Sequence, residues 1–171
     1  MYEKKYKENI NRGQRAEDKF KQLALQRKFN VLKSTLQQDM REHWDFEITK
    51  TLDTKVYKKR IDVKGIKKYD GKLTDEYVFI ELQNVGGGKG WLYGKADGIA
   101  FEINDGFILV ELTALQKKIA EIVDLTQDSR QTRTKKEPYI IYDRRNWNNK
   151  DKFVLITKSD LLSIKHWKWS F

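Results

Sequence analysis

Two neighbouring stretches of the chain combine acidic side chains with bulky apolar ones in strand-like alternation. Asp45 lies in the segment His43–Ile48, and Asp62 and Lys64 lie in the segment Lys55–Lys67. Because side chains alternate along a strand, Asp62 and Lys64 point to the same face. If the two strands pair, Asp45 approaches Asp62 closely enough for their carboxyl groups to interact.

Two carboxylates at such a separation repel each other unless they are protonated or bridged by a cation. A hard divalent metal ion, which prefers oxygen ligands, is the natural bridge. The ammonium of Lys64 could then orient a water for attack on a phosphodiester. The pattern fits a hydrolytic metal site. The alternative is an exposed strand face with cross-strand salt bridges, because Asp-x-Lys also arises by chance in a chain this charged.

A helix and a strand are expected to precede these acidic segments. From Gly13 to about Lys28 apolar residues recur with helical spacing. The apolar stripe comprises Ala16, Phe20, Leu23 and Ala24. Glu17 lies at the edge of this stripe rather than on the opposite face. Phe29–Thr35 is expected to form a first strand, and the polar segment Leu36–Glu42 a loop.

The middle of the chain predicts further strands. Glu76–Val85 alternates like the two segments before it, and Asp70–Gly71 is a common hairpin turn. The three alternating segments are therefore expected to form an antiparallel meander. Ala96–Ile103 and Phe107–Leu112 predict two more strands joined by a tight turn. A helix from Thr113, late strands and a short last helix complete the pattern.

This order of elements predicts an α+β domain with a mixed central sheet flanked by helices. The chain has 171 residues, which is room for one domain. We expect a single domain over residues 1–171, with a core over about residues 13–123 and a C-terminal extension over 124–171.

The composition narrows the class of partner. The chain carries 35 Lys and Arg against 25 Asp and Glu, a formal net charge of +10. Such a surplus favours a polyanionic partner, nucleic acid first, over a lysine-rich surface that only confers solubility. The absence of cysteine excludes disulfides and thiolate metal sites, and two histidines exclude a multi-histidine zinc site. No apolar run is long enough for a membrane span, so we expect a soluble, cytoplasmic protein without a membrane partner.

The ordered motifs resemble those of the PD-(D/E)XK nuclease superfamily, most closely its branch of Holliday junction resolvases and phage nucleases. The resemblance begins with Gly13-x-x-x-Glu17 on a helix, continues with Asp45 and Asp62-Val63-Lys64, and extends to the Ala96–Phe101 segment. It covers roughly residues 13–123. One departure is Trp44, where the family has a proline before the lone aspartate.

A second register of the same motif is also possible. In it Asp62 is the lone aspartate and Glu81-Leu82-Gln83 replaces the acidic-x-Lys triplet, with Gln83 as the catalytic residue in place of lysine and Lys64 supplying the ammonium from a neighbouring strand. Glu81 and Gln83 are expected on the next strand, facing the same way, so they could extend the site in either register.

The resemblance implies a role for each matching residue. Asp45, Asp62 and the backbone carbonyl of Val63 would ligate Mg²⁺, for which Mn²⁺ could substitute. Lys64 would position the attacking water and stabilise charge on the phosphorus, and Glu17 would reach the metal directly or through water. Glu81, another expected metal ligand, would hold a second ion or orient Lys64.

Basic residues around this site are expected to bind nucleic acid. The candidates are Lys67, Lys68, Lys89, Arg144 and Arg145. The alternative for each is an ordinary solvated side chain, since individual phosphate contacts are modest and depend on salt.

The sequence therefore predicts a Mg²⁺-dependent endonuclease that hydrolyses phosphodiester bonds in branched or duplex DNA. A branched-DNA resolvase is the first subtype, which is expected to act as a homodimer because two strands must be cut, and a site-specific or nicking endonuclease is the second. The expected location is the cytoplasm of a bacterium or of a phage-infected host cell. The rival hypotheses are a catalytically inactive nucleic-acid-binding protein of the same fold and an RNA-cleaving nuclease.

Overall fold

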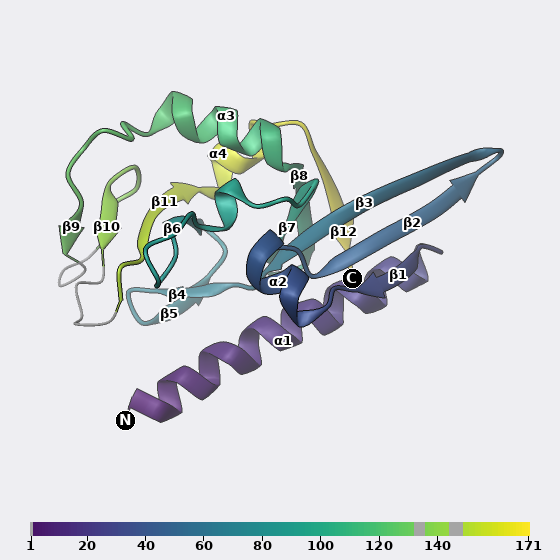
Figure 1. Ribbon diagram of the computed structural model, residues 1–171, viewed down its shortest axis with the longest axis horizontal. Helices are drawn as coiled ribbons and strands as arrows, with labels where there is room; N and C mark the ends of the chain where they lie inside the picture. The colour runs from purple at the N-terminus through teal and green to yellow at the C-terminus, as the bar shows by residue number, and fades with distance from the viewer. Residues whose placement is uncertain (1, 132–135, 144–148) are drawn as a thin grey trace. The chain divides into compact units, whose positions relative to one another are not determined.

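The computed structural model describes residues 2–131, 136–143 and 149–171. The chain has α+β architecture (Figure 1). It divides into two compact units, each assembled from separate stretches of sequence. The first unit comprises residues 1–66, 95–109 and 167–171, and the second residues 67–94 and 110–166. The predicted α+β class with a mixed central sheet is confirmed, and the prediction of one domain stays a prediction.

The first unit is built on a six-stranded sheet with the order β1-β2-β3-β7-β8-β12. Its strands are β1 (Asn30–Lys33), β2 (Phe46–Leu52), β3 (Lys55–Lys64), β7 (Gly98–Ile103), β8 (Gly106–Glu111) and β12 (His166–Ser170), and its helices are α1 (Tyr2–Gln26) and α2 (Leu36–Glu42). β3 pairs antiparallel with β2 and parallel with β7, so the sheet is mixed.

The second unit contains a four-stranded sheet with the order β6-β11-β10-β9 and a separate two-stranded sheet, β4-β5. Its elements are β4 (Lys67–Tyr69), β5 (Lys72–Thr74), β6 (Tyr77–Gln83), the 3-10 helix η1 (Trp91–Tyr93), α3 (Leu112–Ile122), β9 (Arg130–Gln131), β10 (Ile141–Asp143), β11 (Lys152–Thr157) and α4 (Lys158–Leu162). None of the helices in the described part of the chain combines the length and apolar character that crossing a bilayer requires.

Helix α1 covers one face of the six-stranded sheet, as its apolar stripe predicts. The stripe residues are fully or almost fully buried against the α1-facing side chains of β2, β3, β7 and β8: Phe46, Ile48, Ile61, Val63, Ala100, Phe107 and Leu109. Burial of each large side chain contributes about 1.5–3 kcal/mol. The helix ends where Lys28 adopts φ 62° and the N–H of Phe29 donates to the carbonyl of Ala24, a Schellman closure.

Three expectations about the strands are resolved by the pairing. The β7–β8 hairpin is confirmed, and Asp70–Gly71 is a hairpin turn whose φ angles are both left-handed, 49° and 79°. That turn joins the short strands β4 and β5, however, and not the two long strands. The predicted meander is wrong in its third strand, because β3 is followed across the sheet by β7 while β6 pairs with β11.

The segment Leu36–Glu42 forms the helix α2 and not the expected loop. Thr35 and Gln38 form a capping box: the Thr35 side chain accepts from the Gln38 N–H while the Gln38 side chain accepts from the Thr35 N–H. None of the α2 side chains is buried. The start of α2 is therefore stabilised by the capping box at its N-terminus, since the helix has no buried apolar face.

Candidate active site

Asp45 and Asp62 meet where β2 begins beside β3. The N–H of Asp45 donates to the carbonyl of Ile61 at 2.9 Å, which continues the ladder one residue before Phe46. Asp45 Oδ2 accepts from the N–H of Val63 at 2.6 Å, and the carboxyl groups of Asp45 and Asp62 lie close enough for the charge of Asp62 to raise the pKa of Asp45. The expected juxtaposition of the two aspartates is thus present in the structure.

Both aspartates are buried. Asp45 is 7% exposed and Asp62 is 3% exposed. Burial, followed by the charge of Asp62, raises the pKa of Asp45 from 3.8 to about 7. Burial also raises the pKa of Asp62, against the opposing effect of Lys64. Near neutral pH the carboxyl group of Asp45 is therefore protonated in a substantial fraction of molecules, which relieves the repulsion between two close carboxylates.

Lys64 points to the same side of β3 as Asp62, as the i and i+2 spacing predicts. Its Nζ lies 2.8 Å from Asp62 Oδ2, and its side chain is 24% exposed. The same Oδ2 atom is buried and accepts no hydrogen bond of good geometry from any described residue. The short separation is therefore a close ion pair, and the charge of Lys64 lowers the pKa of Asp62 against the effect of burial.

Glu17 on α1 belongs to the same electrostatic cluster but is tied to a lysine. Lys33 Nζ at the end of β1 donates to Glu17 Oε2 at 2.5 Å. Burial raises the pKa of Glu17, the Lys33 hydrogen bond opposes that rise, and the negative charge of Asp45 adds to it. Asp39 on α2 acts on Glu17, Lys33 and Asp62 through its charge.

Lys33 and Asp39 are the cluster members that sequence reasoning missed. Lys33 ends the expected first strand, but alternation alone does not show that it reaches Glu17. Asp39 lies in the segment expected to be a loop, although Thr35 and Gln38, three residues apart, are a capping-box signal that places it on the first turn of a helix.

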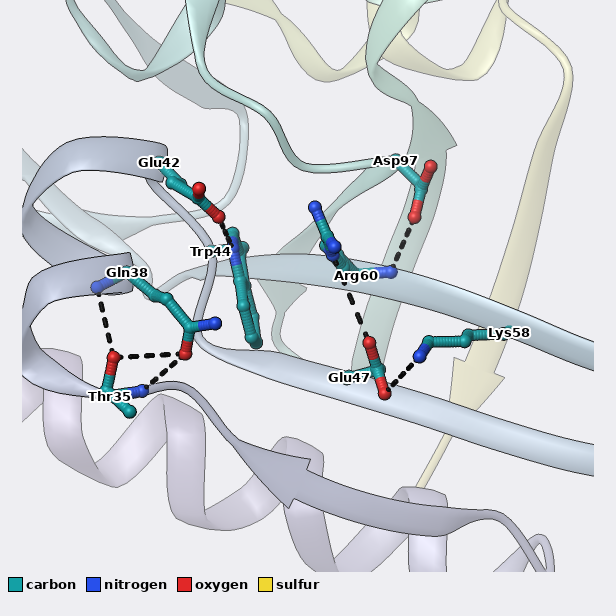
Figure 2. A network of polar contacts seen from close by, with 8 residues as sticks. All are labelled: Thr35, Gln38, Glu42, Trp44, Glu47, Lys58, Arg60 and Asp97. Carbon is teal, nitrogen blue, oxygen red and sulfur yellow. Dashed lines mark hydrogen bonds and ion pairs between the residues drawn. The ribbon is translucent and has the colours of Figure 1, made fainter.

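Polar contacts fix the strands that carry the acidic pair (Figure 2). Asp97, just before β7, accepts from the Arg60 N–H at 2.7 Å, and its own N–H donates to the Arg60 carbonyl at 2.8 Å. Glu47 on β2 pairs with Lys58 at 2.8 Å and lies 4.0 Å from Arg60. Trp44 is buried, donates to Glu42 at 2.9 Å and has the Arg60 guanidinium over its ring. β2, β3 and β7 are thereby held in register at the acidic pair.

Glu81 and Gln83 do not lie on a strand next to β3, which corrects the expectation that they extend the site from the neighbouring strand. They belong to β6, whose partner is β11. Glu81 Oε2 accepts from the Trp91 N–H at 3.2 Å, and Gln83 Nε2 donates to the Lys150 carbonyl at 2.6 Å. Glu81 thus holds the residue that follows the glycine-rich loop, and Gln83 holds the backbone at Lys150. The pairing of β3 with β2 favours the first register, in which Asp45 is the lone aspartate.

The basic candidates fall outside the first unit or outside the described residues. Lys67 and Lys68 on β4 and Lys89 in the glycine run are exposed and belong to the second unit. Arg144 and Arg145 lie outside the described residues. The role of these five residues in nucleic-acid binding stays a prediction.

The donor set at the acidic pair suits a divalent cation in part. Two carboxylates, one with an oxygen that lacks a good hydrogen bond, are oxygen donors of the kind that Mg²⁺ prefers. Within the described ranges, no group of three acidic or histidine side chains is placed to hold a metal ion, and Glu17 is paired with Lys33. The residues therefore fit a cation bound by Asp45 and Asp62, with the remaining positions filled by the main chain or water.

Comparisons with models of protein families, with curated proteins and with solved structures give no match to this chain.

Proposed function

We propose that this protein is a metal-dependent DNA endonuclease whose active site is formed by Asp45, Asp62 and Lys64. The observation that carries the proposal is the contact between two buried carboxyl groups on adjacent strands, with an ammonium 2.8 Å from one of them. A protein gains no stability from burying two like-charged groups side by side. Perturbed carboxyl groups of this kind are concentrated at functional sites.

The residues have distinct parts in this proposal. Asp45, Asp62 and the carbonyl of Val63 would hold the cation, which when bound supplies Lewis-acid polarisation of the scissile phosphate. Asp45 must lose its proton before it can act as a ligand, since a metal competes with protons for a carboxylate. Lys64 orients the attacking water and stabilises the negative charge that develops on the phosphate.

The arrangement of the first unit supports the resemblance to PD-(D/E)XK nucleases. The helix with Glu17, the strand preceded by Asp45 and the strand with Asp62 and Lys64 follow in the order that the resemblance implies. The Ala96–Phe101 segment supplies β7, the strand that lies beside β3 and parallel to it. These are elements distant in sequence that assemble around one pair of carboxyl groups.

The test is cleavage of supercoiled plasmid, linear duplex and four-way-junction DNA with Mg²⁺, Mn²⁺ or EDTA. We expect cleavage with either metal and none with EDTA. Asp62→Asn should abolish cleavage while DNA binding persists, and Lys64→Met should slow it by about 10²-fold or more. The matched control is Asp18→Asn, which removes one negative charge from an exposed position on α1. Full activity of Asp62→Asn would refute the proposed site.

The rival is a nucleic-acid-binding protein of the same fold without catalysis. The Glu17–Lys33 pair favours it, because a carboxylate bound to a lysine is withdrawn from the acidic pair. Binding that survives EDTA without any cutting by the wild-type protein would establish this rival. Replacing the DNA by RNA of the same sequence in the same assay tests for a ribonuclease.

A further inference from the structure

The hairpin of β2 and β3 extends past the strands on either side of it (Figure 1). β1 pairs with β2 only from Phe46 to Thr49, and β7 pairs with β3 only from Ile61 onward. No third strand in the described part of the chain pairs with the stretch from Lys50 to Arg60, because its cross-strand partners, from Glu47–Arg60 to Leu52–Lys55, all lie within β2 and β3. We call this stretch the ribbon. An isolated two-stranded hairpin is at best marginally stable in water, so a bare ribbon of this length calls for a partner.

The ribbon is exposed, basic and partly apolar. Every residue from 51 to 59 is exposed. The ribbon contains five basic residues and one acidic residue, Asp53, in its turn. Its base is anchored, since Lys50 donates to the Arg27 carbonyl and Lys58 pairs with Glu47. Toward the tip, Lys55, Lys59 and Tyr57 share one face, and Tyr57 is 53% exposed.

We propose that the ribbon inserts into the major groove of duplex DNA beside the cleavage site. This inference rests on the proposed function, because it takes the acidic pair as the point of cleavage. A two-stranded β-ribbon fits the major groove of B-form DNA, whereas the major groove of A-form RNA is too narrow for side chains to reach the bases. The lysines complement the phosphates along the groove walls, and the exposed apolar side chains can contact base edges.

The reach of the ribbon follows from its residue spacing. Lys55 precedes Asp62 by seven positions on the same strand. At about 3.3 Å per residue the tip lies about 23 Å from the acidic pair. With a rise of about 3.4 Å per base pair, the ribbon contacts DNA up to about 7 base pairs to one side of the cleaved bond.

Two variants test the ribbon with the full chain. The first, Lys55→Gln/Lys59→Gln, removes two charges without shortening it. The second deletes the cross-strand pairs Thr51–Val56 and Leu52–Lys55, which shortens the ribbon by two pairs and keeps the Asp53–Thr54 turn and the register. The control is Lys21→Gln/Lys117→Gln, an equal change of charge at exposed positions on α1 and α3. Thermal unfolding checks that each variant is folded.

Binding is measured as a function of salt, in EDTA, on a DNA duplex of about 30 base pairs, about twice the roughly 14 base pairs that a reach of about 7 base pairs to each side would span. Loss of two phosphate contacts should reduce the slope of log K against log salt by about 1.8, and the control should leave the slope unchanged. Hydroxyl-radical footprinting of the wild-type protein should show protection about 7 base pairs from the cut on one side, and this protection should shrink by about 2 base pairs in the shortened variant.

An unchanged slope in the first variant would overturn the inference. The inference would also be overturned if the first variant lost as much of the salt slope on an RNA duplex as on DNA. A shortened variant that sediments with one subunit fewer than the wild-type protein would overturn it too, since the ribbon would then bind a second copy of the chain. Cleavage by the wild-type protein is scored separately in Mg²⁺. Cleavage without ribbon-dependent binding refutes the ribbon alone, and ribbon-dependent binding without cleavage refutes the nuclease proposal while supporting the ribbon as a DNA contact.

Discussion

Replacing Asp45 by asparagine should make the stability of the protein less dependent on pH. The pKa of Asp45 is raised from 3.8 to about 7 in the folded protein, whereas the unfolded chain has the ordinary value. Between these two values the folded state binds a proton that the unfolded state has lost, so the free energy of unfolding falls as the pH rises. Above pH 7 the full penalty for ionising the buried carboxyl group is present.

The size of the effect follows from the shift of about three units. At about 1.4 kcal/mol per unit, Asp45 costs the folded state about 4 kcal/mol at pH 8 relative to an unperturbed carboxyl group. Asparagine resembles the protonated acid: its carbonyl oxygen can accept from the Val63 N–H, and its amide can donate to Asp62. The stability of Asp45→Asn relative to wild type should therefore rise by up to about 4 kcal/mol between pH 4 and pH 8.

The assay is urea denaturation of both proteins in EDTA at one-unit steps from pH 4 to pH 8. Asp18→Asn is the matched control for the loss of one negative charge at an exposed position. A difference between wild type and Asp45→Asn that is the same at every pH would refute the argument, because it would show that Asp45 does not titrate in this range in the folded protein.

Three further predictions concern ion pairing, helix capping and close packing in the fold, each measured by chemical denaturation. Lys33→Met leaves the half-buried Glu17 carboxylate without its ion-pair partner, so it should lower stability at pH 8 by about 1–3 kcal/mol; no loss would show that the pair is irrelevant to the fold. Thr35→Ala removes the capping box of α2 and should cost about 1 kcal/mol; an equal loss from the exposed Thr51→Ala would contradict this. Gly90→Ala places a Cβ 2.4 Å from a backbone oxygen and should lower the free energy of unfolding by about 1–3 kcal/mol. Gly13→Ala, with open space around it on α1, should raise the free energy of unfolding by up to about 1 kcal/mol. A change of the same sign in both variants would be inconsistent with the packing.

Local sequence patterns predicted the parts of the first unit that local physics determines. The apolar stripe of α1 and the alternation around Asp45 and Asp62 follow from the periods of the helix and the strand. The β7–β8 turn follows from its Asn-Asp-Gly sequence, and Gly106 is required there because a Cβ would lie 2.0 Å from the Trp169 carbonyl oxygen of β12. Asp45 and Asp62 lie on consecutive strands, so their meeting needed only the simplest pairing.

The remaining features depend on contacts between distant segments. Alternation assigns β6 a buried face but does not say which strand it pairs with, and its partner β11 lies some seventy positions further along the chain. The parallel pairing of Asp62 with Ile99 likewise joins segments that are distant in the sequence, so alternation does not predict it. The hydrogen bond between Lys33 and Glu17 needs β1 to lie beside α1, which no local pattern encodes.

Calorimetric titration of the metal-free protein with Mg²⁺ and Mn²⁺ at pH 6, in buffers of different ionisation enthalpy, tests the central claim most directly. Asp45 is largely protonated at that pH, so binding of a cation by the aspartate pair should release about one proton per protein, and Asp62→Asn should bind no metal. Binding without proton release, or unchanged binding by Asp62→Asn, would contradict the account.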